Sequence, residues 1–524
     1  MSASISRPAC ICRTIGIRYF LASLLLFFNF DQTIKESIMQ TRRSFLRQAS
    51  CSAVVLGGAI LSSCFKKPRP NILWIIAEDI CPDMQCYGNS LVQTPHIDRL
   101  AAEGILYTNC FTTNPVCSPS RSALMTGLYQ TSIGAHHHRS HRQDENPAQP
   151  AYRLAEPIKL ITEYFRQAGY HTSNVRGFFG GYTVGGKTDW NFAWDNPFDG
   201  QDWNERAPEQ PFYAQINMSL THRVFKRDPD NPIDPAVVEM PPYYVDHPLA
   251  RRDWADYLES IQVLDRQVGD VLKRLEDEGL LDQTIIFFFG DNGRPHFRGK
   301  QWLYDPGIHV PLIIRFPSAK GAGQVRDDLI SAIDISATSL SLAGIKPPNY
   351  MHGQVFLGKR AKKRDYIIAA RDRCDETMDR IRCVRSKRYK YIRNYYPERP
   401  YAQLNRYKET QYPVLRLMRR LAAAGELNEA QARFFASMRP EEEFYDLQVD
   451  PFEIHNLAGT ADVQGELKKL RAILEKWIQQ TGDQGEEKED PAIATYYEQK
   501  SKANYNERLA QLYREEGMDV DFIK

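Results

Sequence analysis

An uninterrupted apolar run of strand length occupies residues 71–77, which read Asn71-Ile72-Leu73-Trp74-Ile75-Ile76-Ala77. A second run of the same character reads Thr284-Ile285-Ile286-Phe287-Phe288-Phe289. Strands that are apolar on both faces are typical of a parallel sheet covered by helices on both sides. We therefore expect both segments to be central strands of one such sheet.

Oxygen-bearing side chains follow each of these strands. Glu78 and Asp79 come after the first strand, and Asp291 and Asn292 come after the second. Because ligands collect beyond the carboxyl ends of the strands in an open parallel sheet, we expect these groups to meet there. Oxygen ligands alone select a hard divalent cation, Ca²⁺ or Mg²⁺, and argue against zinc. The alternative is that each pair caps a turn after a buried strand, as Asp and Asn often do.

A third motif, Cys117-Ser118-Pro119-Ser120-Arg121, places a cysteine two residues before a proline and four before an arginine. Ser118 can cap a helix and Pro119 suits a first helical position, so the motif can be a simple helix start. A cysteine there can also be a nucleophile, provided that its pKa is lowered. The rest of the sequence has to decide between these two interpretations.

The cysteine motif resembles the maturation signature of the sulfatases. Further segments resemble the sulfatase pattern in the expected order, namely residues 94–100, 115–127, 299–305, 310–313, 444–447 and 450–457. The resemblance covers about residues 70–460, and this shared order is more specific than any single motif. It favours a metal site over turn caps and a nucleophile over a helix cap.

The resemblance implies a modified nucleophile at Cys117. In sulfatases a dedicated maturation enzyme oxidises this cysteine to formylglycine, whose hydrated aldehyde attacks the sulfate. The second hydroxyl of the hydrate lets the covalent sulfate leave as the aldehyde re-forms. Of the implied partners, Arg121 orients the hydrate and His222 contacts the sulfate. Lys300 neutralises the sulfate oxygens and assists the leaving group.

The resemblance also implies one divalent cation, with Ca²⁺ as the first choice and Mg²⁺ as the alternative. Its ligands would be Asp79, Asp291 and Asn292. Glu78 joins them at a position where the usual residue is aspartate.

A second lysine of the family usually lies in a Gly-Lys-Trp-His segment. The counterpart here is Gly186-Lys187-Thr188-Asp189-Trp190, which makes Lys187 the candidate. The histidine of that segment is missing, so either Asp189 takes over part of its role or proton transfer is organised differently. Together, a cation, two lysines, an arginine and a histidine can hold the oxygens on which charge develops during sulfuryl transfer.

Candidate substrate-binding residues lie in two charged segments. Asp375, Glu376 and Arg382 belong to segment 371–391, which could hold a sulfated sugar through arginine forks, or could be a solvated sheet face. His137 lies just after the nucleophile helix in His136-His137-His138, where adventitious metal binding or a surface loop is the alternative.

Two details resemble the heparan N-sulfatases, also called sulfamidases. They are Arg223 directly after His222, and residues 375–378 shortly before residues 382–385. This branch implies that Arg223 contributes to substrate binding. It also implies N-sulfoglucosamine of a heparan-type glycosaminoglycan as the substrate.

Alternating strand-like and helix-like segments predict an α/β fold as far as about residue 345. Its core is a large, mainly parallel sheet flanked by helices, and we expect helices at residues 157–169 and 253–279. The fold of the resembled family, which is similar to alkaline phosphatase, agrees. This part is predicted to be the catalytic domain, residues 65–360.

A smaller C-terminal domain is predicted at residues 361–482. It would contain an antiparallel sheet with a covering helix at residues 463–481, and its expected strands are residues 366–369, 381–386 and 389–394. Residues 483–524, which are rich in Lys and Glu, are expected to be a solvent-exposed charged tail.

The first 64 residues are predicted to be an export signal. Thr41–Arg47 contains the twin arginines Arg42-Arg43, and an apolar segment leads to Leu61-Ser62-Ser63-Cys64, which resembles a bacterial lipobox. Cys64 would then be the lipidated first residue, with Met39 as the true start. We expect a lipid-anchored protein of the periplasm or cell surface. A membrane anchor at residues 16–30 is the alternative, although a bilayer span needs about 20 residues.

Length, charge and cysteine content exclude further classes of function. The chain has 524 residues and a formal net charge of +2, which gives nucleic-acid binding no support. Its ten cysteines show no zinc-type spacing. Cys374 and Cys383 could pair across neighbouring strands, although free buried thiols are the default.

We predict a hydrolase of sulfate esters or sulfamates on carbohydrates. One competing hypothesis is a phosphomonoester, phosphodiester or phosphonate hydrolase of the same superfold, because fold does not fix function. Another is an inactive glycan-binding lipoprotein of the cell surface. The intact Cys117, Arg121 and Lys300 argue against the second of these.

Overall fold

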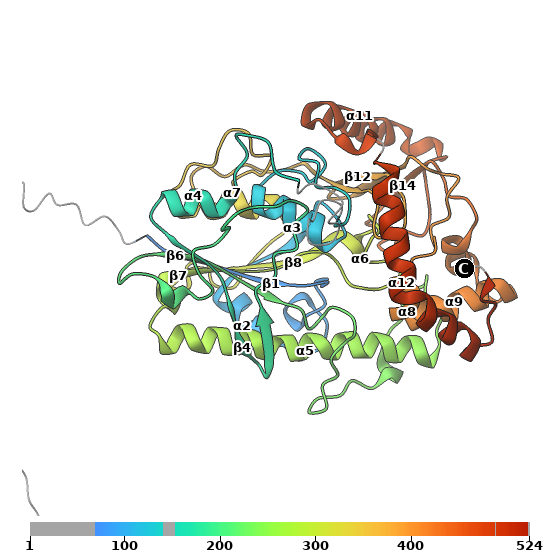
Figure 1. Cartoon of the computed structure of the whole chain (residues 1–524), viewed down its shortest axis with the longest axis horizontal. Helices are drawn as coiled ribbons and strands as arrows, with labels where there is room; N and C mark the ends of the chain where they lie inside the picture. Colours follow the sequence, from blue (N-terminus) through green and yellow to red (C-terminus); the bar gives the residue numbers. More distant parts are fainter. Residues whose placement is uncertain (1–68, 140–151, 488, 522–524) are drawn as a thin grey trace, which may run out of the picture. The chain divides into compact units, whose positions relative to one another are not determined.

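A sheet of eight strands lies at the centre of the structure (Figure 1). In spatial order its strands are β10 (Ile330–Ser331), β2 (Gly104–Phe111), β8 (His309–Arg315), β7 (Thr284–Gly290), β1 (Asn71–Ala77), β6 (Phe212–Met218) and β3 (His171–Asn174), with β9 (Gln324–Arg326) paired to β2. Strand β1 is parallel to β6 and β7, whereas β8 is antiparallel to β2 and β7. The mainly parallel sheet expected from the sequence is confirmed.

The computed structural model describes residues 69–139, 152–487 and 489–521, all of which belong to one compact unit. The predicted export signal, including Met39, Arg42, Arg43 and Cys64, lies outside the described residues. Within the described ranges, no helix combines the length and the apolar character that crossing a membrane requires.

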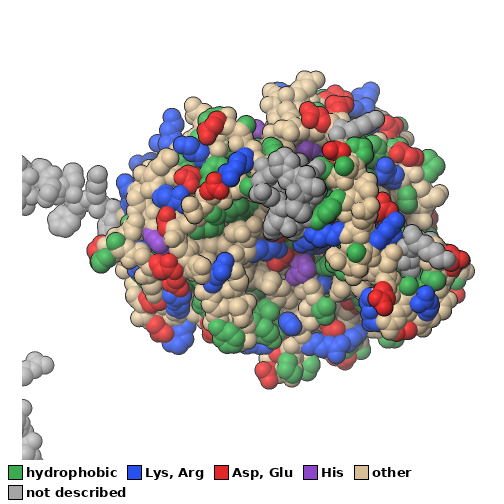
Figure 2. Space-filling view, in the orientation of Figure 1, with side chains coloured by type: hydrophobic (Ala, Val, Ile, Leu, Met, Phe, Trp, Pro, Cys, Tyr) green, Lys and Arg blue, Asp and Glu red, His purple; other side chains and the backbone are tan. Residues whose placement is uncertain are grey.

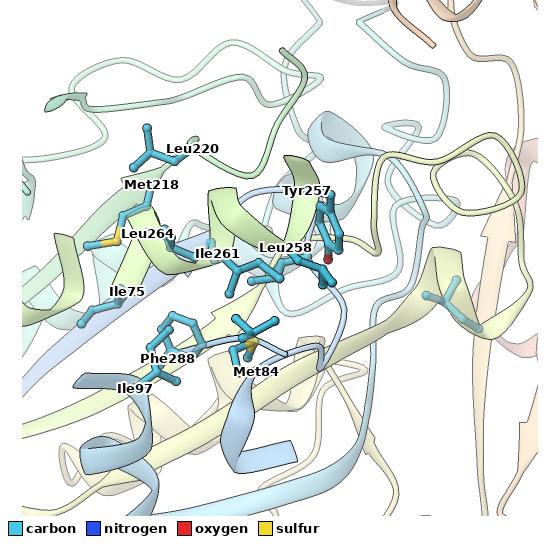
Figure 3. Packing of buried hydrophobic residues seen from close by; sticks show 14 of the residues in the cluster. Ile75, Met84, Ile97, Met218, Leu220, Tyr257, Leu258, Ile261, Leu264 and Phe288 are labelled. Atoms are coloured by element: carbon cyan, nitrogen blue, oxygen red, sulfur yellow. The ribbon is translucent and has the colours of Figure 1, made fainter. Parts of the chain in front are cut away.

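Alternate side chains of the central strands pack into two separate hydrophobic layers. Ile75 and Phe288 pack with Leu258 and Ile261 of helix α5 (Pro248–Asp277) on one face, as Figure 3 shows. Helix α2 (Pro95–Glu103) covers the same face. Trp74 belongs to the opposite layer, which is covered by α3 (Cys117–Thr126), α4 (Ile161–Gln167) and α7 (Ile333–Leu342). Because successive strand residues point to opposite faces, a continuous apolar run fills both layers.

Two helices expected from the sequence are present with shifted ends. The helix expected at 253–279 is α5, which begins earlier because Pro248 occupies its first position and His247 caps it. The Nδ1 atom of His247 accepts a hydrogen bond from the backbone N of Leu249 at 3.1 Å. The helix expected at 157–169 is the shorter α4, which follows the extended Leu160.

The smaller antiparallel sheet is also confirmed. Its strands are β11 (Tyr366–Arg371), β12 (Ile381–Ser386), β13 (Tyr389–Asn394) and β14 (Glu442–Asp446). The expected covering helix is α11 (Gln464–Thr481), whose Leu467, Leu470 and Leu474 pack against Val384 and Phe444. The sequence prediction missed β14 as a strand of this sheet. It also missed α8 (Arg406–Gln411), α9 (Pro413–Ala424) and α10 (Glu429–Ala432).

The C-terminal segment corrects one expectation. Residues 483–524 were expected to be solvent-exposed, but they contain the 25-residue helix α12 (Pro491–Glu515). Tyr497, Leu509 and Tyr513 of this helix are buried. The hydroxyl of Tyr513 donates a hydrogen bond of 2.7 Å to Glu409 of α8. A sparse apolar pattern on one face is therefore enough to hold α12 against α8, beside which it lies in Figure 1.

Candidate active site

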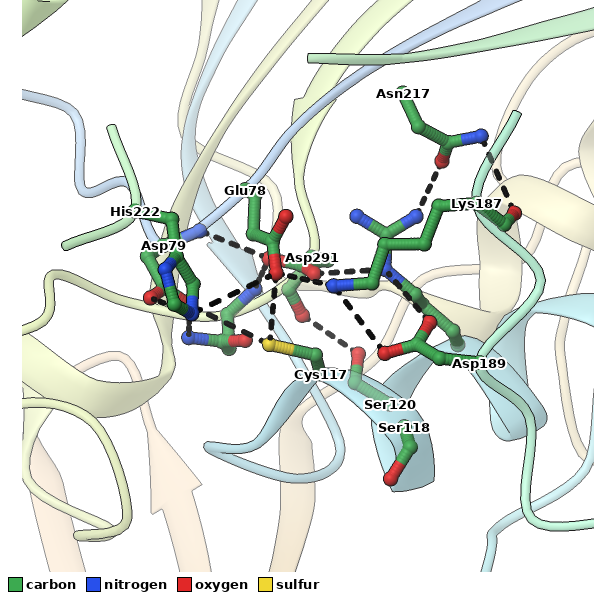
Figure 4. Close-up of polar contacts among 12 residues, drawn as sticks. Glu78, Asp79, Cys117, Ser118, Ser120, Lys187, Asp189, Asn217, His222 and Asp291 are labelled. Atoms are coloured by element: carbon green, nitrogen blue, oxygen red, sulfur yellow. Dashed lines mark hydrogen bonds and ion pairs between the residues drawn. The ribbon is translucent and has the colours of Figure 1, made fainter. Parts of the chain in front are cut away.

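The ends of β1 and β7 bring the four expected metal ligands together. Ala77 is paired with Gly290 in the sheet, so strands β1 and β7 end at the same level of the sheet. Asp79 has a positive φ of 56°, which Asp tolerates better than most residues, and its backbone N donates to Asp291 Oδ1 at 3.0 Å. Cys117 is the first residue of α3 and lies beside these ligands in Figure 4.

Three charged side chains surround the thiol of Cys117. Its Sγ atom lies 3.1 Å from Lys300 Nζ, 3.3 Å from Glu78 Oε1 and 3.5 Å from Asp79 Oδ1. Burial raises the pKa of Cys117 well above its usual value, and the ammonium groups of Lys300 and Lys187 offset only part of this rise. The unmodified thiol is therefore neutral, and a neutral thiol is a weak nucleophile.

The oxygen atoms of the four expected ligands suit a hard cation. Glu78, Asp79 and Asp291 supply carboxylates, and ligand atoms of Glu78, Cys117 and Asp291 lie within 4.8 Å of one another. The buried Oδ1 atom of Asn292 accepts no hydrogen bond from any described residue, while its Nδ2 donates to Asp79 at 2.8 Å. An unpartnered amide oxygen among carboxylates is the donor set that Ca²⁺ and Mg²⁺ prefer. The residues present therefore fit a divalent metal.

Both predicted lysines are paired with these carboxylates. Lys300 Nζ lies 2.8 Å from each carboxylate oxygen of Asp79, and Lys187 contacts Glu78 and lies 3.2 Å from Asp189. Burial alone would raise the pKa of Glu78, but Lys187 and the other nearby cations hold it well below its usual value. Burial would lower the pKa values of the two lysines, and their acidic partners raise them instead. Glu78 and the two lysines are therefore charged.

Asp189 links the second lysine to the arginine of the cysteine motif. The hairpin of β4 (Arg176–Phe179) and β5 (Tyr182–Gly185) leads directly to Lys187. Asp189 lies 3.7 Å from Arg121 Nε, which also donates to Asp291 at 2.8 Å. Burial would raise the pKa of Asp189, but Lys187 and Arg121 lower it. Asp189 is therefore a carboxylate that lies between two cations.

His222 presents one ring nitrogen to the centre of the site. Its Nδ1 lies 2.7 Å from the carbonyl oxygen of Arg223, which can only accept a hydrogen bond, so Nδ1 carries the proton. Its Nε2 lies 3.7 Å from Asp79 Oδ2 and 4.0 Å from Glu78 Oε1.

These groups lie at a cavity of about 540 Å³. Of the predicted site residues, the cavity is lined by Glu78, Cys117, Lys187, His222, Arg223, Lys300 and Asp375. A volume of this size is in the range of pockets that enclose whole organic ligands.

A family model described as "Sulfatase" matches residues 70–345. The chain belongs to the sulfatase family. A second model, described as "N-sulphoglucosamine sulphohydrolase, C-terminal", matches residues 293–413 of this sulfatase. The family assignment made from the cysteine motif is confirmed. The chain is accordingly a sulfuric ester hydrolase of a family that generally binds a divalent metal.

Individual relatives agree with this assignment. An ulvan-active sulfatase of Formosa agariphila is 39% identical over 461 residues, covering 79% of this sulfatase and 76% of the relative. The N-sulphoglucosamine sulphohydrolase of Homo sapiens is 26% identical over 488 residues, covering 83% and 94%. One solved structure, described as a complex with the substrate D-glucosamine-2-N,6-O-disulfate, has a TM-score of 0.56 at 18% identity, covering 80% of this chain and 100% of that chain. It shows that the fold is shared.

Two arginines expected to bind substrate have internal partners in this sulfatase. Arg223 donates to both carboxylate oxygens of Asp253 at 2.6 and 2.7 Å and to the carbonyl oxygen of Pro295 at 2.8 Å. Arg382 is completely buried and pairs with Asp372 at 3.0 Å and Asp483 at 2.6 Å. Arg382 does not line the cavity, and Arg223 reaches it with its guanidinium already paired. Neither supports the expected contact with substrate.

Two further predicted residues lie behind the cavity wall of the sulfatase. Glu376 accepts a hydrogen bond of 2.7 Å from the backbone N of Arg406, and His137 accepts one of 3.2 Å from the backbone N of Arg373. Their neighbours face the cavity instead. His138 and Asp375 both line it, and His138 Nδ1 lies 2.9 Å from Asp375 Oδ1.

Of the run at 136–138, the structure therefore brings His138, and not the predicted His137, to the cavity. The partner of His138, Asp375, is 237 residues away, so a local pattern could not single out this histidine. Tyr407 of α8 and five residues of α12 also line the cavity of the sulfatase, and no motif indicated them.

Proposed function

We propose that this sulfatase removes sulfate from a carbohydrate by means of a formylglycine that a maturation enzyme makes from Cys117. The supporting observation is the position of Cys117 in the cavity, between Lys300 and the carboxylates of Glu78 and Asp79. Its pKa is raised, so the unmodified thiol would react poorly. A hydrated aldehyde at the same place offers hydroxyl groups to the sulfate.

In the proposed reaction, one hydroxyl of the hydrate loses its proton and attacks the sulfur atom. The bond from sulfur to the sugar nitrogen of a sulfamate, or to the sugar oxygen of a sulfate ester, breaks. The departing nitrogen or oxygen takes up a proton. The second hydroxyl of the residue then loses its proton, the aldehyde C=O bond re-forms, and the C–O bond to the sulfate breaks. Addition of water to the aldehyde restores the hydrate, and the net reaction is hydrolysis.

The surrounding residues would assist through fixed charge. Lys300, which Asp79 holds in place, would neutralise sulfate oxygens and assist the leaving group. Arg121, held by Asp291, would orient the hydrate, and the Nε2 atom of His222 would contact the sulfate. Such preorganised charges act most strongly where water is excluded.

We infer that Ca²⁺, with Mg²⁺ as the alternative, is held by Glu78, Asp79, Asp291 and Asn292. When bound, the ion supplies positive charge next to the sulfate oxygens. The unpartnered Oδ1 atom of Asn292 supports this assignment.

For the substrate we propose N-sulfated glucosamine at the end of a heparan-type chain. The model match over residues 293–413 and the human relative support this choice. A sulfated unit of ulvan is the second candidate, because the relative described as active on ulvan is 39% identical. Kinetics on N-sulfated glucosamine, ulvan oligosaccharides and an aryl sulfate would decide between them. Phosphate and phosphonate esters belong in the same assay, since turnover of these alone would favour the competing hydrolase class.

Mass spectrometry of the peptide that contains Cys117 tests the nucleophile directly. We expect an aldehyde residue without sulfur in protein produced together with the maturation enzyme. An unmodified thiol in fully active protein would rule out formylglycine.

We further propose that the protein is exported by the twin-arginine route from Met39 and anchored by lipid at Cys64, in the periplasm or at the cell surface. The motif around Arg42 and the lipobox-like residues 61–64 support this proposal.

A further inference from the structure

One face of α12 forms a wall of the active-site cavity. The cavity is lined by Tyr497, Lys500, Ser501, Asn504 and Tyr505 of this helix. Their spacing of three and four residues places them on the same side of a helix. The matched family models end at residues 345 and 413, well before α12. This wall is therefore a feature of the chain outside the matched segments.

Contacts at both ends and in the middle fix the helix in place. Before its first turn, Glu489 receives two hydrogen bonds from the buried Arg373 at 2.5 and 2.9 Å. Asn506 accepts one of 2.6 Å from Arg406, and the buried Leu509 anchors the second half. The face that lines the cavity is therefore held at a defined distance from the reactive centre.

The outer part of the cavity is lined by cationic and aromatic side chains. Lys500 lies on α12, and Arg139 and Lys226 lie on other parts of the wall. The described residues that line the cavity include two carboxylates, Glu78 and Asp375, and both already have cationic or histidine partners. In Figure 2, Lys, Arg and His side chains lie around the hollow near the middle of the molecular face that is drawn.

Two tyrosines line the cavity next to these cations. The ring of Tyr505 lies 6.1 Å from the ring of Tyr407, which belongs to α8. The Tyr407 hydroxyl is buried and forms no hydrogen bond with any described residue. Flat aromatic surface next to hydrogen-bonding and charged groups is suited to a sugar that carries an anionic group.

We propose that this face of α12 binds the saccharide unit next to the sulfated one, and that this unit carries a carboxylate or a second sulfate. Lys500, together with Lys226 of the same cavity, attracts the anion, and Tyr505 packs against the sugar ring. The inference rests on the proposed function, because it places the sulfated unit at Cys117. It names the substrate class as an anionic oligosaccharide and not a single sugar.

Binding to a Cys117→Ala protein, measured by isothermal titration calorimetry, tests the proposal without turnover. The probes are a sulfated glucosamine, the disaccharide with a linked uronic acid, the same disaccharide with its carboxyl group reduced, and a disaccharide whose second unit carries a sulfate. We expect the anionic disaccharides to bind about tenfold more tightly than the other two, as one charge-assisted hydrogen bond allows. Comparing the uronic acid with the second sulfate identifies the anion.

Lys500→Ala and Tyr505→Ala, each combined with Cys117→Ala, should remove this advantage. Lys502→Ala is the matched control, since Lys502 is on the same helix, pairs with Glu498 at 3.0 Å and does not line the cavity. Equal binding of all probes, or equal losses with Lys500→Ala and Lys502→Ala, would overturn the inference. If the wild type hydrolyses an aryl sulfate in that case, only the α12 subsite fails. If it hydrolyses none and no probe binds, the proposed function fails as well.

Discussion

The Nζ atom of Lys300 lies 3.1 Å from the Sγ atom of Cys117, and Asp79 holds this ammonium group with both carboxylate oxygens. A positive charge is therefore fixed at the position of the nucleophile. Lys300 is buried, so it cannot move away from that position without losing its partner.

Replacing Cys117 should abolish hydrolysis and leave the fold intact. Cys117→Ala removes one sulfur atom at the cavity, and we expect a loss of stability of about 1 kcal/mol. Activity on an aryl sulfate and the thermal midpoint measure the two effects. Cys86→Ala is the matched control, because this free, half-buried cysteine is not among the residues that line the cavity. Equal turnover by wild type and Cys117→Ala would refute the mechanism.

Removing the divalent ion should inactivate the enzyme. Asp291→Ala and Asn292→Ala should reproduce the effect of chelation, because each removes one expected oxygen ligand. Elemental analysis should find about one bound ion in the wild type and less in both variants. Asp282→Ala, which removes an exposed carboxylate, should retain both metal and activity. Full activity after exhaustive chelation, with no metal detected, would contradict the ligand assignment.

Arg382→Ala should lower the free energy of unfolding and leave the preference among sulfated sugars unchanged. The change leaves Asp372 and Asp483 buried without their shared partner, and breaking such a pair costs about 3–5 kcal/mol. Arg388→Ala removes a half-exposed partner of Asp446 and should cost much less. Denaturant unfolding measures both. A variant Arg382→Ala of normal stability and altered preference among sulfated sugars would restore Arg382 as a substrate-binding residue.

The free energy of unfolding should decrease as the pH falls from 6.5 to about 4. Burial lowers the pKa values of His136 and His309 to about 4, whereas an unfolded histidine titrates near 6.5. In that range the unfolded state binds more protons, so stability is complete above pH 6.5 and is lost as the pH falls. Thermal midpoints across this range should fall, and His309→Asn should reduce the slope. A midpoint that stays constant down to pH 4.5 would contradict the prediction.

Export should begin at Met39 and require both arginines of the pair Arg42-Arg43. Replacing both with lysine should keep the precursor in the cytoplasm, because the twin-arginine motif is read by its receptor. Cys64→Ala should release the mature protein from the membrane fraction, as followed by fractionation and lipid labelling. A Cys64→Ala protein that stays membrane-bound would exclude the lipobox and favour the anchor at residues 16–30.

The sequence predicted the catalytic centre better than the substrate contacts. Glu78 and Asp291 were found because each directly follows an apolar strand, and the sheet brings such positions together. Arg382 was placed wrongly because charge along a sequence does not show whether an arginine is paired inside the fold. Its partner Asp483 is 101 residues away.

Helix α12 was missed for a related reason. α12 has few apolar residues, so its sequence is similar to that of a solvated segment, and the buried Tyr497 and Tyr513 find their partners only in the folded chain. Local sequence patterns therefore could not predict that α12 forms a wall of the cavity.

Six cysteines of the described chain are free, and those at positions 81, 110, 374 and 383 are buried with pKa values that burial raises. Such thiols stay protonated at neutral pH and are screened from oxidants. We therefore expect these four thiols to stay reduced in a reducing cytoplasm and in an oxidising compartment alike. None of the six cysteines of the described residues forms a disulfide, so folding of this part needs no disulfide-forming machinery.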